Sequence, residues 1–375
     1  MTSTVNLPQG FRAAGVTAGL KASGRSDLAL VVNDGPDHHA AAVFTSNRVE
    51  AAPVTWSRQV VSDGRVDAVI LNSGGANACT GSPGFLDTHR TAEKVGEVLG
   101  VSAGDVVVCS TGLIGERLPM DLLLPGVDAV ATALSVDGHD AAATAIMTTD
   151  TVSKQATFVG DGWSVSGMAK GAGMLAPGLA TMLVVITTDA LIDDEVADRA
   201  LRGATGGSFD RLDSDGCMST NDTVLLMASG ASGVKPGWKA LLEGVTRVCL
   251  DLAVQLIADA EGAHHDIEIE VRSAASEADA LEVARAIARN NPASGPTPSG
   301  NKLVTSTKKT STSATSALPR AASKRSGGVL CVLPRRPAAL HRAMTISRSS
   351  ALSPHTSTSQ STVASSFLRW VAEMF

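Results

Sequence analysis

The 375-residue sequence has no apolar run near the ~20 residues that a membrane-spanning helix needs. Its first segment, MTSTVNLPQGFRAAG, lacks both the basic flank and the apolar core of a secretory signal. The five cysteines are widely spaced and form no Cys-x-x-Cys pair, which argues against a zinc site or a redox pair. These absences favour a cytoplasmic protein with reduced thiols, no membrane partner and no metal.

The charges are distributed unevenly along the chain. Residues 291–375 contain 11 Lys and Arg but one acidic residue, Glu373, whereas residues 1–290 contain 20 basic and 36 acidic residues. Ser and Thr supply 27 of the tail's 85 residues, and no apolar period runs through it. This composition is typical of a segment that does not fold alone. We expect a boundary near Asn291 and a largely disordered tail, in which only the apolar piece at 327–334 has the composition of a strand.

Short apolar runs alternate with helical patterns through the body of the chain. The patterns predict strands at 28–33, 40–45, 67–73, 105–110, 181–190, 222–230 and 264–274, and helices at 87–100, 119–134, 193–204 and 238–261. This alternation predicts an α/β fold of layered helices and mixed sheets. No internal repeat is present, and no Gly-x-Gly-x-x-Gly motif opens a helix after a strand.

The stretch AKGAGMLAPGLATML at 169–183 runs directly into the strand pattern VVITTDA. A phosphate-binding loop is disfavoured, because its Gly-Lys-Ser/Thr opens a helix, whereas here the lysine comes first and a strand follows. One interpretation is a connecting loop in which Thr181 is an ordinary strand residue. The other is a self-cleavage site, since cutting the Ala180–Thr181 bond would place an α-amine with a pKa of about 7.7–8.0 beside the Thr181 hydroxyl. The glycines and Pro177 would permit the strained backbone of an N→O acyl shift.

Three segments in order resemble the ornithine acetyltransferase family, the glutamate N-acetyltransferases of arginine biosynthesis. They are MTTDT at 147–151, KGAGMLAPGLATML at 170–183 and STNDTV at 219–224, and the resemblance extends from residue 8 to about 290. Members of this family cleave themselves before the threonine of the ATML motif and share a fold with self-processing aminopeptidases. The resemblance implies an α subunit of residues 1–180, a β-subunit body of residues 181–290, and an α2β2 heterotetramer.

The resemblance also assigns catalytic roles. It implies that Thr181 is the nucleophile and that Ala180–Thr181 is the processing bond. Thr111 and Gly112, in the segment CSTGLIGERLPM, match the family's oxyanion pair. A hydroxyl and a backbone N–H at a strand end suit that role, because both can point at one developing oxyanion.

Three further residues, Thr148, Lys170 and Glu261, match the family's substrate contacts. Lys170 suits the α-carboxylate that acetylornithine and glutamate share. Glu261 is expected where the long helix ends, with Gly262 as the C-cap, a position unfavourable for a carboxylate. The adjacent histidines 264 and 265 would point to opposite faces of a strand, so we expect no metal there.

Two departures from the family's pattern are visible. The segment NSGGANACTG has Gly75 where the family has a second asparagine. The segment of GxDPNWGR type, the strands after it and the C-terminal asparagine and threonine or serine that complete the family's substrate site are missing from residues 291–375. The abrupt change of composition there is typical of a reading-frame change. No binding residue beyond Glu261 is therefore assigned, and we expect acetyl transfer to be weak or absent.

The expected activity is acetyl transfer from N2-acetyl-L-ornithine to L-glutamate through an acetyl-threonine intermediate. That cycle needs no metal or organic cofactor, and acetyl-CoA would serve only as a second acetyl donor. Two alternatives stay open at this point. One is an aminopeptidase or amidohydrolase that uses the same threonine and passes the acyl group to water. The other is a binding protein whose basic tail engages nucleic acid, although the tail, with one Trp and two Phe, offers no stacking platform.

Overall fold

The computed structural model describes residues 7–174, 182–214, 216–262 and 265–288, with side chains from residue 269 onward in the last range, and the backbone of 301–307 and 329–334. All of them belong to the first of two compact units, residues 1–344. Ala180, Thr181 and most of the tail beyond residue 290 lie outside the described residues. The division into an α subunit, a β-subunit body and a tail therefore stays a prediction.

The first sheet has the strand order β1-β2-β4-β5. Strands β1, β2 and β4 pair antiparallel, and β4 and β5 pair parallel. Three of these strands were predicted from the sequence within one residue at each end. The four strands are β1 (Phe11–Val16), β2 (Leu28–Asn33), β4 (Ala68–Asn72) and β5 (Val106–Ser110).

The second sheet has the strand order β3-β10-β8-β7-β6. Its central strands β8 and β10 run parallel, and β7 pairs antiparallel with β8 so that Lys170 lies opposite Leu183. The predicted cleavage bond is therefore in the connection between two paired strands. The five strands are β3 (His39–Phe44), β10 (Thr223–Ala228), β8 (Leu183–Thr188), β7 (Ser164–Lys170) and β6 (Lys154–Val159).

Three apolar clusters lie between the four layers that these two sheets and their helices form. Side chains of β8 alternate between two of them, because successive residues of a strand face opposite sides. Val184 and Ile186 pack toward helices α5 (Asp194–Gly207) and α6 (Trp238–Ala258), whereas Val185 packs toward the first sheet. This double burial explains why the sequence of β8 reads as a continuous apolar run.

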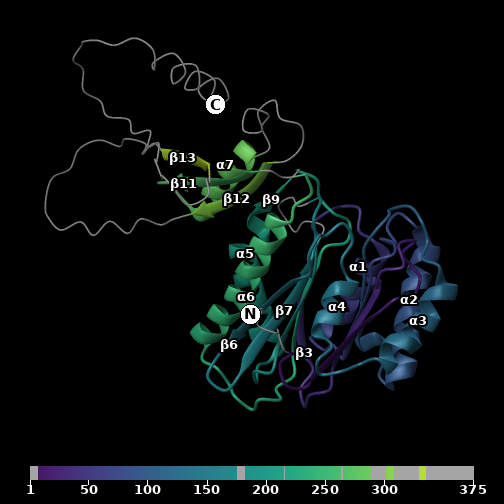
Figure 1. The fold of residues 1–375 in the computed structure, drawn as a ribbon. Helices are drawn as coiled ribbons and strands as arrows, with labels where there is room; N and C mark the ends of the chain where they lie inside the picture. The colour runs from purple at the N-terminus through teal and green to yellow at the C-terminus, as the bar shows by residue number, and fades with distance from the viewer. Residues whose placement is uncertain are drawn as a thin grey trace, which may run out of the picture. The chain divides into compact units, whose positions relative to one another are not determined.

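The outer face of the first sheet is covered by helices α2 (Gly81–Leu99) and α3 (Met120–Thr132) (Figure 1). The helices α1 (Ala52–Val60) and α4 (His139–Ala145) contribute to the cluster between the two sheets. The order of layers is therefore helices, sheet, sheet, helices. This arrangement confirms the predicted α/β fold of layered helices and mixed sheets.

A third sheet is built around β11 (His265–Arg272), with the strand order β13-β11-β12-β9. Its strand β9 is Leu212–Asp213, and helix α7 (Glu277–Ala288) contacts β11. The backbones of β12 (Asn301–Thr307) and β13 (Val329–Pro334) lie on either side of β11, parallel and antiparallel respectively. Two segments of the predicted tail thus pair with the last strand of the body.

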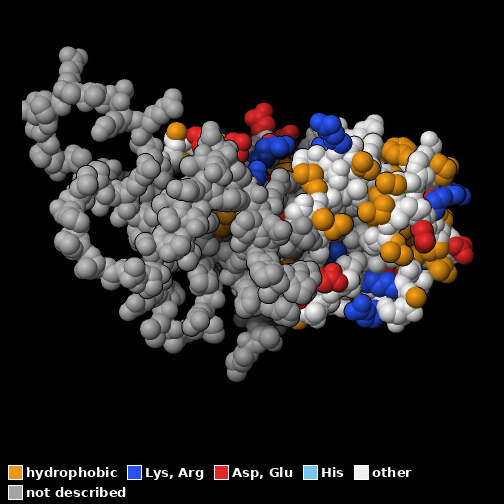
Figure 2. Space-filling view, turned by 90° about the horizontal axis from the view of Figure 1, so that it is seen from above, with side chains coloured by type: hydrophobic (Ala, Val, Ile, Leu, Met, Phe, Trp, Pro, Cys, Tyr) orange, Lys and Arg blue, Asp and Glu red, His pale blue; other side chains and the backbone are white. Residues whose placement is uncertain are grey.

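Where the chain is described, none of its helices combines the length and the apolar character needed to cross a membrane. Figure 2 shows apolar side chains interspersed with charged side chains of both signs on the described part of one face. Single exposed apolar residues of this kind are normal on a protein surface.

Candidate active site

The residues predicted as an oxyanion pair lie at the end of β5. The Thr111 N–H donates to the Asn72 carbonyl at 3.0 Å, which ties this end of β5 to β4. Gly112 has φ +137°, and a Cβ placed on it would lie 2.8 Å from the Gly75 backbone nitrogen. Only glycine fits this close approach. Gly75, the departure noted in the sequence, thus packs directly against the predicted oxyanion residues.

Lys170, the last residue of β7, reaches this strand end from the second sheet. Its side chain is only 2 % exposed, and Nζ donates to Thr111 Oγ1 at 3.3 Å. The pKa of Lys170 is lowered by burial and by the charge of Lys154, against the opposing effect of Asp150 and Asp222. The structure therefore brings together Thr111 and Lys170, which are 59 residues apart in the sequence.

Asp150 links Thr148 to the end of β7. Its Oδ2 accepts the Thr148 N–H at 2.9 Å, and its Oδ1 accepts the Gly171 N–H at 2.7 Å. Although burial raises the pKa of Asp150, the charges of Lys170 and Lys154 and the hydrogen bonds from Lys154 and the Gly171 N–H lower it below its ordinary value. One ionised carboxylate thus holds Thr148, itself a predicted substrate contact, and the residue directly after the predicted contact Lys170.

A buried lysine fixes Asp150 in turn. Lys154, whose side chain is fully buried, places Nζ 2.6 Å from Asp150 Oδ1 and 2.6 Å from Asp259 Oδ2. Asp259 also accepts hydrogen bonds from the backbone and hydroxyl of Thr151. The buried Asp150 and Lys154 and the half-buried Asp259 join the loop before β6 to the C-terminal end of α6.

Glu261 follows that helix end, but the predicted cap is wrong. Helix α6 ends at Ala258 with Asp259 as its C-cap, and Gly262, at φ 67°, comes three residues later. The helix stops earlier because the Asp259 side chain is held by Lys154 and Thr151. Glu261 is exposed and donates its N–H to the Ala172 carbonyl at 2.6 Å. A Cβ on Gly173 would lie 3.1 Å from Glu261 Oε2, so the carboxylate lies against the loop that leads to the predicted cleavage bond.

Asp222 holds the residue that follows Thr181. Its Oδ1 accepts the Met182 N–H at 3.0 Å, and the Thr223 N–H donates to the Met182 carbonyl at 3.1 Å. Burial raises the pKa of Asp222 to about 8, despite the Met182 N–H, the Ser219 hydroxyl and the charge of Lys170. Asp222 is therefore mostly protonated at pH 7. The neighbouring Asn221 donates to the carbonyls of Ala76 and Ser110, so this segment joins the start of β8 to the end of β5.

Residues 12–293 match the model of the ArgJ family. The chain belongs to the ArgJ family. It is 66 % identical over 288 residues to the arginine biosynthesis bifunctional protein ArgJ of Streptomyces coelicolor, an alignment that covers 77 % of this chain and 75 % of that protein. It is 62 % identical to the protein of the same name from Thermobifida fusca, over 76 % of this chain and 75 % of the relative.

Among solved structures, the chain is similar to an ornithine acetyltransferase from Mycobacterium tuberculosis that was determined in complex with ornithine. The identity is 56 % and the TM-score is 0.46, with 48 % of this chain and 97 % of that chain covered. The family match confirms the resemblance identified in the sequence, and it ends at residue 293, close to the boundary expected near Asn291.

The predicted site residues that the structure describes lie near one another. Thr111, Gly112, Thr148, Lys170 and Glu261 all lie around the two ends of the β7–β8 connection, whereas Ala180 and Thr181 are outside the described residues. Four ionisable residues of this site were not predicted from the sequence. Two of them lie inside segments that carried the resemblance, Asp150 in MTTDT and Asp222 in STNDTV, and the other two are Lys154 and Asp259.

Proposed function

We propose that the chain is a self-processing acyltransferase that moves the acetyl group of N2-acetyl-L-ornithine to L-glutamate in arginine biosynthesis. The observation that carries this proposal is the hydrogen bond between Lys170 Nζ and Thr111 Oγ1, at the end of the strand that pairs with β8. The relatives are named as arginine biosynthesis bifunctional proteins, which agrees with the pathway.

The first chemical step is cleavage of the Ala180–Thr181 bond. In this step Thr181 Oγ1 attacks the Ala180 carbonyl carbon, the C–N bond breaks, and the Oγ1 proton passes to the Thr181 nitrogen. Water then hydrolyses the ester and leaves Thr181 with a free α-amine. Asp222 supports this geometry, because it fixes the N–H of Met182, one peptide bond beyond the nucleophile.

The acetyl transfer then uses the new α-amine as the base. The amine takes the Oγ1 proton, Oγ1 attacks the acetyl carbonyl carbon, and the α-amine of ornithine leaves with that proton. The α-amine of glutamate attacks the resulting acetyl-threonine ester, and Oγ1 regains a proton. The Thr111 hydroxyl and the Gly112 N–H are the proposed oxyanion donors, each with a contribution of ~3–4 kcal/mol to transition-state stabilisation.

The contact between Lys170 and Thr111 suits the oxyanion role. A lysine ammonium only donates hydrogen bonds, so Thr111 Oγ1 is the acceptor in this contact. The Thr111 proton therefore remains available to a substrate oxygen. In the same position Lys170 has further N–H groups for the α-carboxylate that both amino acids share. Thr148 and Glu261 complete the proposed set of substrate contacts, and acetyl-CoA is the proposed second donor.

Intact-mass spectrometry tests the processing step. We expect wild-type protein to give two associated fragments, residues 1–180 and 181–375, and the Thr181→Ala variant to give one uncut chain. Thr181→Ser keeps a hydroxyl and should still be cut. A Thr181→Ala protein that splits at this bond would contradict threonine-driven cleavage. Light scattering of the cleaved protein tests the proposed α2β2 assembly.

An isotope-labelled acetyl group tests the transfer step. Because residues 291–375 lack the segments that complete the family's substrate site, we expect label from N-acetylornithine to appear on glutamate only slowly and, transiently, on the fragment that begins with Thr181. Label that appears only in free acetate would identify the amidohydrolase alternative instead. Label on neither product, with cleavage intact, would contradict an acyl-transfer function for this chain.

A further inference from the structure

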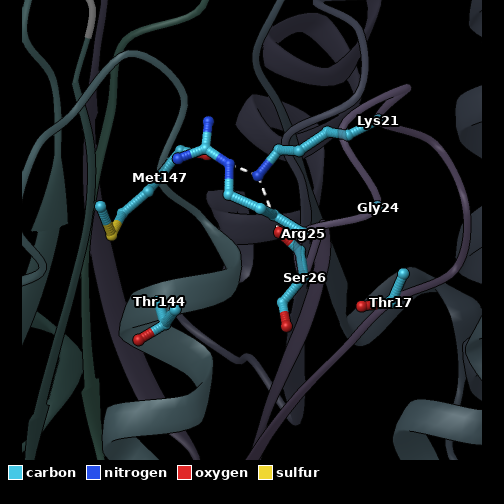
Figure 3. Close-up of a pocket in the computed structure, with 7 residues that line it drawn as sticks. All are labelled: Thr17, Lys21, Gly24, Arg25, Ser26, Thr144 and Met147. Carbon is cyan, nitrogen blue, oxygen red and sulfur yellow. Dashed lines mark hydrogen bonds between the residues drawn. The ribbon is translucent and has the colours of Figure 1, made fainter.

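A cavity of about 440 Å³ lies beside the loop that carries Thr148. Its lining combines two cations, three hydroxyl groups and one thioether, with no acidic side chain among them (Figure 3). The lining residues are Thr17, Lys21, Gly24, Arg25, Ser26, Thr144 and Met147. Figure 3 shows the Lys21 and Arg25 side chains converging on the same region of this cavity.

Lys21 is held rigidly in this wall. Its ammonium donates to the carbonyls of Ser26 and Met147 at 2.7 Å and 2.6 Å. Burial and the nearby charge of Arg25 lower the pKa of Lys21 to about 8. The nearby carboxylate of Asp27 already accepts backbone N–H groups from Ala18, Leu20 and Lys21 itself. The local positive charge therefore favours an anionic ligand.

Arg25 connects this cavity to the candidate active site. Its guanidinium, which is exposed, donates one N–H to the Thr148 carbonyl at 3.2 Å. Arginine has five N–H groups, so this contact leaves donors for a ligand in the planar arrangement that matches a carboxylate. Thr148 in turn is bonded to Asp150, which also holds the residue after Lys170. The charge of Lys170 contributes to the low pKa of Lys21, so the two ammonium groups are within electrostatic range of each other.

The two amino acids of the proposed reaction differ in the charge at their distal end. Ornithine ends in an ammonium group, which the carboxylate of Glu261 suits, and glutamate ends in a second carboxylate, which Glu261 repels. We propose that the Lys21–Arg25 cavity binds the distal carboxylate of the acceptor amino acid and that Arg25 is the residue that contacts it. This inference rests on the proposed function. It adds a structural reason for the choice of glutamate as the acetyl acceptor.

Calorimetric titration of the full chain with single ligands tests the inference. The ligands are L-glutamate, L-glutamine, which lacks the distal charge, and N-acetylornithine. We expect Arg25→Met to weaken glutamate binding by about tenfold or more, as for loss of one charge-assisted hydrogen bond. Binding of glutamine and N-acetylornithine should change little, and Arg25→Lys should restore part of the glutamate affinity. The control is Arg90→Met, which removes an exposed arginine from helix α2.

Several results would overturn the inference. One is unchanged glutamate affinity in Arg25→Met, and another is an equal loss for glutamine. A third is wild-type protein that binds N-acetylornithine but not glutamate. Displacement of glutamate by inorganic phosphate equally well in wild type and Arg25→Met would also overturn it, because it shows non-specific anion binding.

The same measurements distinguish failure of the proposed function from failure of the proposed acceptor site. If wild-type protein binds glutamate in an Arg25-dependent way but transfers no acetyl group, the acceptor site stands and the transferase function does not. If wild-type protein transfers acetyl groups and Arg25→Met leaves the KM for glutamate unchanged, the function stands and the acceptor site does not.

Discussion

Replacing Lys154 by methionine should destabilise the fold more than any surface change. Lys154 is fully buried, and its ammonium lies between Asp150 and Asp259 at 2.6 Å from each. Methionine fills a similar volume but leaves the buried Asp150 and the half-buried Asp259 without their shared cation. Breaking a buried ion pair in this way costs about 3–5 kcal/mol, because an uncompensated charge remains in a low-dielectric interior. For a body of this size that loss lowers Tm by roughly 6–20 °C.

The assay is urea unfolding, followed by circular dichroism, in the Thr181→Ala background. An uncut chain prevents the two fragments from separating on unfolding, and equal protein concentrations remove any difference due to assembly. Lys239→Met is the matched control, because Lys239 is an exposed lysine on α6 and its loss should leave the midpoint unchanged.

The pH dependence of the stability difference distinguishes lost charge interactions from lost packing. Hydrogen bonds and charges that include Lys154 lower the pKa of Asp150 and of Asp259 in the folded protein, although burial opposes them. Their contribution to stability is therefore complete above the ordinary carboxyl pKa of about 3.9 and is lost as the pH falls below it. Without Lys154, burial is opposed only by Lys170 and the Gly171 N–H at Asp150 and by Thr151 at Asp259. Both pKa values should therefore be higher in the variant than in wild type, so the variant loses less stability as the pH falls. The difference in stability from wild type should narrow toward acid pH. A decrease in the free energy of unfolding of less than about 1 kcal/mol would refute this account of the network. A decrease that does not change with pH would refute it as well.

Two further substitutions test the candidate site. Lys170→Met should weaken both N-acetylornithine and glutamate by ~1.5–3 kcal/mol, as for loss of a charge-assisted hydrogen bond, and steady-state KM values check this; unchanged values for both would limit Lys170 to a structural role. Asp222→Asn keeps an acceptor for the Met182 N–H but removes a carboxyl whose pKa is raised to about 8. Wild-type stability relative to this variant should fall as the pH rises from about 4 to about 8, because the unfolded chain releases the proton first. Urea unfolding at four pH values measures the trend, and a constant difference would count against a protonated Asp222.

Most of the strands that the sequence predicted are buried on both faces, whereas β11 was predicted from its alternating pattern. Strand β8, LVVITT, and strand β10, TVLLMA, read as continuous apolar runs because helices cover one side and the other sheet covers the second. Strand β7, SVSGMAK, was not predicted, since two serines and a glycine interrupt its pattern. Gly167 is nonetheless required there, because a Cβ on it would lie 2.8 Å from Val248 of α6. That requirement comes from helix packing and has no local signal in the sequence.

The contacts of the candidate site likewise depend on packing that leaves no local signal in the sequence. The predicted contacts Thr111, Thr148 and Lys170 came from segments that resemble a known family, and the structure places them close together. The contact between Lys154 and Asp259 joins residues 105 positions apart, and neither residue stands out by spacing or composition. Pairings of this kind are set by the way α6 crosses the second sheet, which only the assembled fold determines.

The charge balance of these groups suits the proposed binding of a substrate carboxylate. Asp150 and Asp259 offset Lys154 and Lys170, so the inner network is close to neutral when both lysines carry their protons. A third carboxylate would make it negative and repel the α-carboxylate of either amino acid. Asp222 avoids this, because burial raises its pKa to about 8 and leaves it protonated at neutral pH. It can therefore fix Met182 by a hydrogen bond without adding charge beside Lys170.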